Sequence, residues 1–375
     1  MIERTIEGSI IRDIEGNKAI LLFGARQTGK TTLLKKLFHG KENVLWLNGD
    51  NQDTHTLLDD ITYPRFKTLF GRYRTIVIDE AQQIKNIGLI IKIFTDQIPE
   101  IKIIATGSSA FDLANKTSEP LTGRKKEHYL FPLSFSEMCQ HHHFLEEYRL
   151  LEHRLIYGYY PEVVNNPGLE KDILKSLTDS YLYKDLLIWG NLRHSDMLIK
   201  LLQLLALQIG NEVSYNELAQ NLGIDRGTVE RYIDLLEKTY VIFRLSSFSR
   251  NQRNEIKKSR KIYFVDNGIR NALIANFATF PLRNDIGALW ENFLISERRK
   301  FLFYKNIWAN SYFWRTTNQV EIDYIEEMDG FLQAYEFKWS KKKEKKTKVP
   351  SSFSASYPNH TFKLITPTNL EAFIL

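Results

Sequence analysis

The chain has 375 residues, of which 43% are hydrophobic and 13% aromatic, a composition that excludes a disordered protein and favours two or three globular domains. Its formal net charge is +6 with an isoelectric point near 9.0, which favours an anionic partner such as a nucleotide or nucleic acid. Cys139 is the only cysteine, so an intramolecular disulfide is excluded. The first residues lack the apolar core of a signal peptide, and apolar runs such as 201–207 are too short to span a bilayer. We therefore expect a cytoplasmic protein without a membrane segment.

A glycine-rich loop lies between a predicted strand and a predicted helix in the N-terminal third. The apolar run AILLF (19–23) is followed by GARQTGKT and then by TLLKKLF. This spacing matches a phosphate-binding loop, because the glycines let the backbone N–H groups approach phosphates at a helix N-terminus. Lys30 would reach the β- and γ-phosphates, and the Thr31 hydroxyl would bind Mg²⁺. The predicted ATP-binding residues are Gly24, Ala25, Arg26, Gln27, Thr28, Gly29, Lys30, Thr31 and Thr32.

An acidic pair ends the next clear strand pattern, TIVIDEAQQI (75–84). Acidic residues at the carboxyl end of a strand lie at the ligand edge of a parallel α/β sheet. Asp79 would complete the Mg²⁺ shell, and Glu80 would orient the attacking water as a general base. A helix-capping role for Asp79 is the plainer alternative.

Two further segments offer candidate residues for the same site. The strand IKIIATGSS (101–109) ends in hydroxyl residues, and Ser108 in particular either senses the γ-phosphate or belongs to an ordinary turn. Arg124 follows a glycine in LTGRKKEHYLFPLSF and is either a trans-acting arginine finger or a solvated basic residue.

Taken together, GARQTGKT, IVIDEAQ, ATGSS and LTGR…YLFPLSFSE resemble the AAA-type ATPases of the AAA_14 family over roughly residues 1–140. The resemblance implies a parallel sheet covered by helices on both faces, and ATP hydrolysis. It also implies that a homo-oligomer is possible, because Arg124 would act on a neighbouring subunit.

The middle of the chain predicts helices and then a helix-turn-helix. Residues 144–205 have helical spacing, interrupted by YGYYPEVVNNP, and would form a helical lid or linker. Ser214 and Asp225 are predicted to cap two helices joined at Gly223, followed by the strand YVIFRLSSF, as in a winged helix. Leu218, Leu222, Val229, Ile233 and Leu236 would point inward. Arg226, Thr228 and Arg231 would face DNA; packing between domains is the alternative role. The basic run 249–261, which includes Lys261, is either a phosphate-contacting segment or a solvated loop.

The C-terminal third contains a predicted hairpin, QVEIDYIEEMDGFLQAYEFKWS (319–340), whose turn is Asp329-Gly330. With this turn, Asp323 lies opposite Glu336, and Glu321 opposite Lys338. Two opposed carboxylates destabilise a sheet, whereas a divalent cation between them removes that cost. An amphipathic hairpin with a wet outer face is the structural alternative. Glu291 lies on a predicted helix upstream, as a solvent-facing residue or a further metal ligand.

The order of these elements resembles the PD-(D/E)XK nuclease fold, and KIYFVDNGIRNAL…WENFL…VEIDYI…YEFKWS is similar to the DUF4143 domain that occurs fused to AAA_14 ATPases. This resemblance implies a nuclease triad of Asp323, Glu336 and Lys338, with Glu291 as the helix acid, although the usual Pro-Asp dipeptide is missing. A metal site at CQHHHF (139–144) is not favoured by its spacing, and the run KKKEKKTK (341–348) is typical of solvated charge.

The expected fold class is therefore α/β: a P-loop AAA-type parallel sheet, a helical lid and winged helix, and a restriction-endonuclease-like α/β domain. The expected domains are 1–143, 144–205, 206–258 and 259–375. The expected function is ATP hydrolysis coupled to a metal-binding nuclease-like domain that acts on nucleic acid, DNA in particular. The alternative is an ATP-dependent regulator or assembly protein whose C-terminal domain binds without cleaving.

Overall fold

The computed structural model describes residues 2–59, 62–108, 121–179, 195–249, 259–340 and 347–375. Two compact units account for the fold: the first contains Met1–Leu133 and Lys238–Tyr240, and the second contains Ser134–Glu237 and Val241–Leu375. Among the described residues, none of the helices combines the length and the apolar content needed to cross a membrane.

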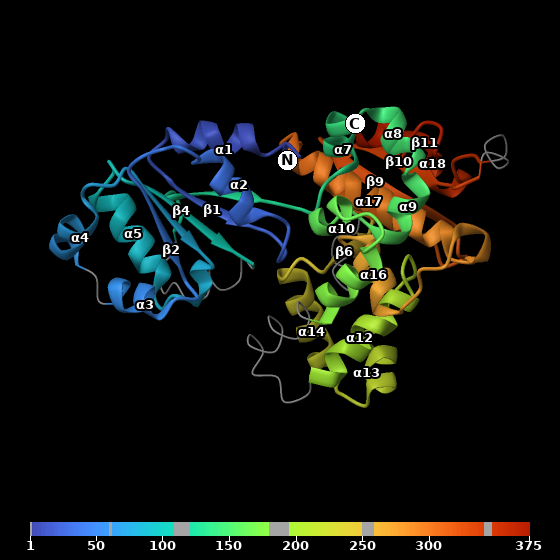
Figure 1. Cartoon of the computed structure of the whole chain (residues 1–375). Helices are drawn as coiled ribbons and strands as arrows, with labels where there is room; N and C mark the ends of the chain where they lie inside the picture. The colour runs from blue at the N-terminus through green and yellow to red at the C-terminus, as the bar shows by residue number, and fades with distance from the viewer. Residues whose placement is uncertain (1, 60–61, 109–120, 180–194, 250–258, 341–346) are drawn as a thin grey trace. The chain divides into compact units, whose positions relative to one another are not determined.

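The first unit is built on a five-stranded parallel sheet with the order β2-β3-β4-β1-β5 (Figure 1). Its strands are β1 (Ala19–Phe23), β2 (Val44–Asn48), β3 (Thr75–Asp79), β4 (Lys102–Gly107) and β5 (Lys125–Tyr129). Its helices are α1 (Glu7–Ile14), α2 (Lys30–Leu37), α3 (Gln52–Leu58), α4 (Tyr63–Phe70) and α5 (Ile87–Gln97). Every residue of β1 is buried, which shows that both faces of the sheet are covered, as expected for parallel strands.

An extended apolar core packs against one face of this sheet. Leu21, Ile76 and Ile103 pack there against Phe66 of α4 and Phe94 of α5. The helix α1 contacts β1 and α2. The strand patterns AILLF (19–23), TIVIDEAQQI (75–84) and IKIIATGSS (101–109) are confirmed as β1, β3 and β4, although β3 ends at Asp79 and β4 at Gly107.

The second unit begins with a helical stretch and continues into a six-stranded mixed sheet. The helices before the sheet are α7 (Phe135–His142), α8 (Phe144–Arg149), α9 (Leu151–Tyr157), α10 (Pro161–Asn165), α12 (Ser195–Leu207), α13 (Tyr215–Leu222) and α14 (Arg226–Lys238), and residues 170–179 are also helical. The predicted interruption of the helices in YGYYPEVVNNP is confirmed: α9 ends at Tyr157, and Pro161 begins the short helix α10, where a missing N–H is tolerated.

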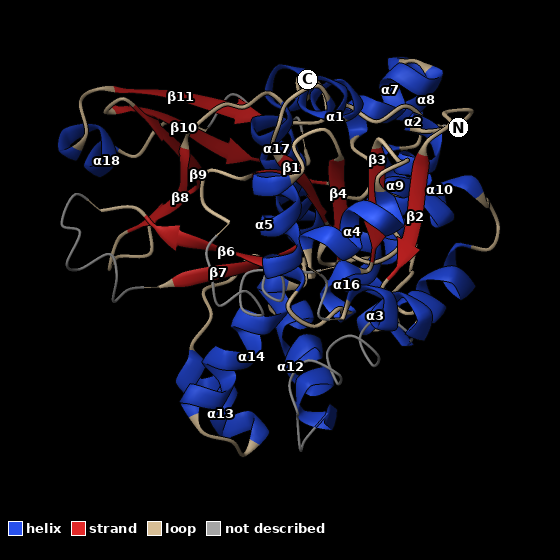
Figure 2. Ribbon diagram, turned by 90° about the vertical axis from the view of Figure 1, so that its left-hand side faces the viewer, coloured by secondary structure: helices blue, strands red, loops and turns tan. Residues whose placement is uncertain are grey.

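The strand order of the second sheet is β11-β10-β9-β8-β6-β7, and Figure 2 shows these strands in red. They are β6 (Ile242–Ser247), β7 (Arg260–Phe264), β8 (Asn310–Arg315), β9 (Glu321–Met328), β10 (Phe331–Phe337) and β11 (His360–Ile365). The remaining helices are α16 (Asn267–Leu273), α17 (Ile286–Tyr304), α18 (Ser351–Ser356) and α19 (Glu371–Ile374). The strand predicted after the helix-turn-helix is confirmed as β6, and it pairs with β8 of the same sheet that contains the predicted hairpin.

The helix-turn-helix elements agree with their predicted boundaries. The Ser214 hydroxyl accepts a hydrogen bond from the backbone N–H of Glu217, and Gly223 ends α13 in the left-handed conformation. Asp225 accepts a hydrogen bond of 2.8 Å from the N–H of Thr228. The five predicted inward residues are buried: Leu218, Leu222, Val229, Ile233 and Leu236.

The hairpin prediction is also confirmed. Asp329 and Gly330 both have positive φ values, 52° and 79°, as a two-residue turn matching the strand twist requires. Met328 pairs with Phe331, and the ladder continues to Tyr324 and Tyr335 in the predicted register. The structural alternative, a hairpin with a wet outer face, is contradicted, because Ile325, Leu332 and Ala334 on that face pack in a core with Phe353 of α18.

Candidate nucleotide site and acidic cluster

The glycine loop of the first unit has a shape that only glycine permits at its two ends. Gly24 has a φ of 151°, and a side chain there would place its Cβ 2.2 Å from the carbonyl oxygen of Leu130. Gly29, with a φ of 95°, directly precedes α2. These positions explain the two fixed glycines of the motif, because one needs space and the other needs a left-handed backbone.

Two side chains of the glycine loop, those of Lys30 and Thr28, donate hydrogen bonds to the backbone of the loop itself. The Lys30 ammonium donates hydrogen bonds to the carbonyl oxygens of Gly24 and Ala25, at 2.8 and 2.9 Å, and is almost fully buried. The Thr28 hydroxyl donates to the carbonyl of Ala25. Gln27 has a positive φ of 58° at the exposed turn. Arg26 is half-buried, and Thr32 is exposed on α2.

Thr31 and Asp79 meet at the carboxyl edge of the sheet. The Thr31 hydroxyl donates a hydrogen bond of 2.7 Å to Asp79 Oδ2, and Thr106 donates its hydroxyl proton to Asp79 Oδ1. The strand order explains this meeting, because β4, which ends just after Thr106, lies between β1 and β3. The two residues predicted to hold Mg²⁺ are therefore adjacent, and hydroxyl and carboxylate oxygens are ligands that Mg²⁺ prefers.

Glu80 follows Asp79 in a left-handed conformation, with φ of 48° and ψ of 42°. Gly49 makes room for it, since a Cβ at Gly49 would lie 2.2 Å from the carbonyl oxygen of Glu80. The amide of Gln82 donates hydrogen bonds to Glu80 Oε2 at 2.5 Å and to the Ser108 hydroxyl at 3.2 Å. Gln82 thus links the predicted base to the predicted γ-phosphate sensor. In the sequence, the only signal for this role is weak: Gln82 closely follows the acidic pair.

Arg124 lies at the opposite edge of the sheet from the glycine loop. Its carbonyl oxygen accepts a hydrogen bond from the N–H of Ala19, the first residue of β1. Its guanidinium forms an ion pair with Asp96 at 2.6 Å. Ser109, the last residue of the predicted strand segment IKIIATGSS, lies outside the described residues.

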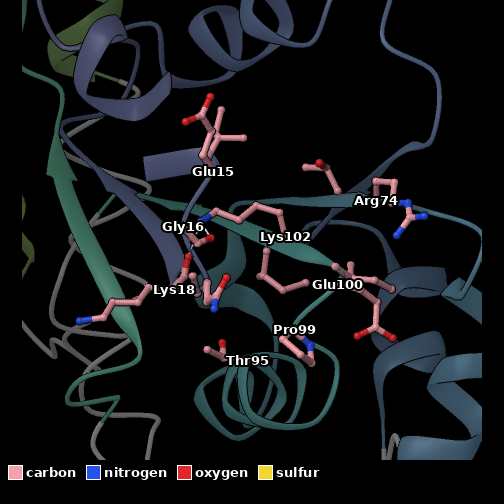
Figure 3. A pocket seen from close by; sticks show the side chains of 14 residues that line it. Glu15, Gly16, Lys18, Arg74, Thr95, Pro99, Glu100 and Lys102 are labelled. Atoms are coloured by element: carbon pink, nitrogen blue, oxygen red, sulfur yellow. Dashed lines mark hydrogen bonds between the residues drawn. The ribbon is translucent and has the colours of Figure 1, made fainter. Parts of the chain in front are cut away.

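A polar cavity of about 280 Å³ opens at this same amino edge (Figure 3). It is lined by the first residues of three strands, Ala19, Thr75 and Lys102. The Lys102 ammonium donates to the backbone carbonyls of Asp13, Gly16 and Lys18, at 2.5, 2.8 and 2.5 Å. Because these carbonyls already bind the ammonium, Lys102 is not available as a cation for a ligand in the cavity. The cavity lies at the amino edge of the sheet, so it is separate from the predicted nucleotide site at the carboxyl edge.

The second unit gathers the predicted nuclease-like residues on its mixed sheet. One step beyond the ladder pair of Tyr324 and Tyr335, Asp323 lies opposite Glu336. Asp323 is 9% exposed, and its Oδ2 accepts a hydrogen bond of 2.7 Å from the N–H of Phe337. Lys338 forms an ion pair of 2.6 Å with Glu336. The triad predicted from the sequence is therefore brought together.

Glu291 of α17 joins this group, and so does a lysine that the sequence did not place there. Lys261 of β7 is 1% exposed, and its ammonium contacts Glu291 Oε1 at 3.1 Å and also Glu321 Oε1. The hydroxyl of Tyr263 donates to the same Glu291 oxygen at 2.6 Å. Within the described part of the chain, Glu291, Glu321 and Asp323 are grouped closely enough to share one cation.

These contacts correct one prediction. Lys261 was placed in a basic segment that either contacts phosphate or is solvated, but it is buried among carboxylates. Glu321, which was expected opposite Lys338 in the hairpin, forms ion pairs with Lys261 and Arg315. The alternation of Lys261 and Tyr263 in RKIYF was the available signal, since both side chains lie on one face of β7. The neighbouring basic residues 250–258 and the run 341–346 lie outside the described residues.

The cluster holds more negative charge than its buried surroundings favour. Burial, with a further contribution from Glu336, raises the pKa of Asp323 to about 6. Burial likewise raises the pKa of Glu291 to about 7, and the charge of Asp323 adds to this effect. For Lys261, burial alone would lower the pKa, but Glu291 and Glu321 together raise it. A divalent cation would relieve the carboxylate repulsion, so the donor set fits a hard metal ion.

Two other sequence candidates have different surroundings. Arg226 and Arg231 are exposed on α14, whereas the Thr228 hydroxyl donates to Asp225 at 2.6 Å. In the CQHHHF segment, His142 contacts Glu147 at 2.8 Å, and burial together with Glu147 raises the pKa of Cys139 to about 12. Among the described residues, this segment does not form a group of metal-binding side chains.

Comparisons with known proteins agree with this architecture. Residues 16–139 match the AAA domain family AAA_14, residues 148–279 match DUF8612, a domain of unknown function, and residues 286–372 match DUF4143, also a domain of unknown function. The fold is similar to that of the Walker-type ATPase PABY2304 of Pyrococcus abyssi, with a TM-score of 0.50 and 17% identity, over 73% of this chain and 96% of that one.

Related sequences occur in both archaea and bacteria. An uncharacterized protein of Methanocaldococcus jannaschii, MJ1544, is 25% identical over 342 residues, which cover 84% of this chain and 74% of the relative. An uncharacterized protein of Mycobacterium tuberculosis, Rv2008c, is 25% identical over 324 residues, covering 85% and 70%. The chain is therefore an AAA_14–DUF4143 protein, with an ATP-binding AAA domain of the P-loop fold over residues 16–139 and a DUF4143 domain over residues 286–372.

Proposed function

We propose that this protein hydrolyses ATP and uses the nucleotide cycle to control a metal-binding, nuclease-like DUF4143 domain that acts on nucleic acid, DNA in particular. The observation that supports the ATPase half is the hydrogen bond between Thr31 and Asp79, because it joins the glycine loop and the acidic pair in one site. The helical segment 144–205 would respond to the nucleotide, and residues 206–258 would form the winged helix.

In the proposed reaction, the backbone N–H groups of the loop and the Lys30 ammonium bind the phosphates of ATP. Bound Mg²⁺ would neutralise phosphate charge, and Thr31 and Asp79 are the residues that would hold it. Glu80 would accept a proton from the attacking water, and Ser108 would contact the γ-phosphate. Arg124 lies at the far edge of its own sheet, which supports a role only toward a neighbouring copy in a homo-oligomer.

The ATPase proposal is tested by comparing wild type with Lys30→Ala and Glu80→Gln. Lys30→Ala should lose both ATP binding and hydrolysis, because it removes the phosphate-binding ammonium. Glu80→Gln should still bind ATP but hydrolyse it roughly 100-fold or more slowly, as the loss of a general base predicts. Normal hydrolysis by either variant would contradict these assignments.

The nuclease half rests on the close grouping of Asp323, Glu336 and Lys338 with Glu291. Asp323 and Glu291 would hold a divalent metal together with Glu321, which lies in the same group, or with the predicted ligand Glu336. The metal would supply Lewis-acid stabilisation of a phosphate. Lys338 is one-third exposed, so its ammonium can reach a bound phosphodiester as well as Glu336. Its pKa is raised, because Asp323 and Glu336 outweigh the effect of burial, so it would act as a cation and not as a base.

Single-turnover cleavage of single- and double-stranded DNA, with Mg²⁺ or Mn²⁺, tests this half. Lys338→Ala should abolish cleavage, whereas Lys363→Ala, an exposed lysine on the adjacent strand β11, should leave it unchanged. Equal cleavage by wild type and Lys338→Ala, or none by either, would reject the nuclease assignment.

A second function is favoured by one observation, the buried ammonium of Lys261 between Glu291 and Glu321. An internal cation partly neutralises the cluster and competes with a metal for the same oxygens. In this alternative the domain binds nucleic acid without cutting it, and the protein is an ATP-dependent regulator or assembly factor. DNA binding that persists without metal-dependent cleavage would support it.

The exposed residues Arg226 and Arg231 of α14 provide the test of nucleic-acid binding in either case. Replacing both with alanine should weaken binding and reduce the slope of log affinity against log salt by about one to two, since each lost phosphate contact contributes about one. An unchanged slope would assign this helix pair to packing between domains.

A further inference from the structure

An arginine near the start of the chain lies directly behind the glycine loop. Arg4 is 8% exposed, although it precedes every element of the first sheet. Its guanidinium donates two hydrogen bonds to backbone carbonyls, from Nη1 to Thr28 at 2.9 Å and from Nη2 to Phe131 at 2.6 Å. The side chain therefore bridges two segments that are separated by about a hundred residues in the sequence.

The two carbonyls belong to parts of the chain that define the loop. Thr28 precedes Gly29, and Arg4 Nη1 lies 3.9 Å from the position that a Gly29 Cβ would occupy. Phe131 follows β5, next to Leu130, whose carbonyl oxygen approaches Gly24 at the other end of the loop. Both ends of the loop thus rest on residues 130–131, one end directly and the other through Arg4.

The orientation of one peptide unit follows from this contact. The Thr28 carbonyl and the Gly29 N–H belong to the same planar trans peptide, so they point in opposite directions. When Arg4 holds the carbonyl behind the loop, the Gly29 N–H is directed to the other side, where the proposed phosphates bind. A charge-assisted hydrogen bond to the carbonyl also polarises that N–H toward greater positive charge.

Arg4 is itself fixed by neighbours in the first unit. Its backbone N–H donates to Glu7 Oε1 at 3.0 Å, and Glu7 forms an ion pair of 2.8 Å with Lys36 of α2. The helix that begins at the loop therefore helps to hold the segment that contains Arg4. A guanidinium suits this position, because its planar fork can reach two separate acceptors at once, which an ammonium on a different stem does less well.

We infer that Arg4 is a positioning residue of the nucleotide site, which holds the glycine loop in its phosphate-binding shape by joining Thr28 to Phe131. The inference rests on the proposed ATPase function and extends it to a residue outside the motif. Arg4 itself would not touch the nucleotide.

The test compares wild type with Arg4→Met, Arg4→Lys and the control Arg12→Met in the full-length chain. Arg12 lies on the neighbouring helix α1, is exposed and donates a long hydrogen bond to the Ser9 hydroxyl, at 3.4 Å. The dissociation constant of a fluorescent ADP analogue, the KM and kcat for ATP, and the melting temperature with and without ADP are measured for each.

Arg4→Met should raise the dissociation constant and KM by about tenfold or more, the effect of one lost charge-assisted hydrogen bond, with a smaller change in kcat. Its ADP-induced rise in melting temperature should shrink accordingly. Arg4→Lys should fall between Arg4→Met and wild type, and Arg12→Met should match wild type.

A merely structural Arg4 would give a different pattern. The melting temperature without ADP would fall, while the dissociation constant of the folded fraction and the ADP-induced shift would stay as in wild type, and this result would overturn the inference. If Arg4→Met fails to fold, the same comparison on Arg4→Lys decides, with unchanged nucleotide affinity as the contrary result. A wild-type protein that binds no nucleotide would overturn the ATPase proposal and this inference together, whereas normal wild-type binding with no effect at Arg4 overturns only the latter.

Discussion

Asp323 is a buried carboxyl group whose ionisation the fold opposes. Its pKa is raised from the usual 3.8 to about 6, chiefly by burial and then by Glu336. A carboxyl group with a raised folded-state pKa contributes stability below its unfolded-state pKa, and loses that contribution as the pH rises through the folded value. Without metal, we therefore expect the free energy of unfolding to fall between about pH 4 and pH 7 through this group and Glu291.

The substitution Asp323→Asn isolates this effect, because an amide oxygen can still accept the hydrogen bond from Phe337. At pH 8 without metal, it should raise the free energy of unfolding by about 3 kcal/mol, the value of a pKa shift from 3.8 to about 6. Urea unfolding at pH 4.5 and pH 8 measures it. A variant equally stabilised at both pH values would show that charge is not the cause.

Gln82 is the second residue whose role can be tested singly. It holds both Glu80 and Ser108, so its loss should disturb the orientation of the proposed base more than the binding of ATP. We expect Gln82→Met to lower kcat by about tenfold, part of the effect of a general base, with a KM close to wild type. Gln83→Met, at the less buried neighbouring position, is the matched control. A rise in KM with constant kcat would instead place Gln82 in binding.

Two glycines with positive φ, one in the glycine loop and one in the hairpin turn, are required for different reasons. Gly24 adjoins the carbonyl of Leu130, whereas a Cβ at Gly330 of the hairpin would meet no atom within 4 Å. Gly330→Ala should therefore cost only the strain of a left-handed alanine, about 1 kcal/mol. Gly24→Ala should cost more and abolish nucleotide binding, since the loop must move. Gly40→Ala, with a φ of 68° and open space, controls for strain alone in the first unit.

Chemical unfolding and binding of a fluorescent ADP analogue measure these variants. Nucleotide binding by Gly24→Ala as tight as by Gly40→Ala would contradict the close approach at Leu130. The comparison separates two roles of glycine that a motif cannot distinguish.

Local sequence patterns predicted individual helices, strands and turns better than they predicted the pairing between strands that are distant in the sequence. The Asp329-Gly330 turn set the register of β9 and β10 because a two-residue turn leaves no freedom in the pairing. Lys261 and Arg4 were missed because their contacts depend on long-range placement. Lys261 reaches Glu321 only because β6 and β7 extend the sheet beside β8, and the run before Lys261 looked like a solvated basic loop. Arg4 has no sequence pattern, since its acceptors are backbone carbonyls.

At the scale of the whole molecule, the two proposed ligands belong to different units. The residues for ATP lie within Met1–Leu133, and those for the divalent metal lie within Val241–Leu375. A ligand that binds only the folded form raises the free energy of unfolding of the unit that binds it, and the effect grows with ligand concentration. At one hundred times the dissociation constant, this increase is about 2.7 kcal/mol. The two ligands should therefore affect separate parts of the unfolding transition.

We expect scanning calorimetry to show this separation. With Mg²⁺ present throughout, adding ADP should raise the melting temperature in wild type and in Asp323→Asn, but not in Lys30→Ala. Mn²⁺ alone should raise it in wild type and Lys30→Ala, but not in Asp323→Asn, which loses a carboxylate ligand. The Mn²⁺ effect should increase from pH 5.5 to pH 8, because Asp323 and Glu291, with pKa values of about 6 and about 7, must lose their protons to bind the metal. An Mn²⁺ shift that survives in Asp323→Asn, or that is independent of pH, would exclude the acidic cluster as the metal site while leaving the nucleotide site untouched.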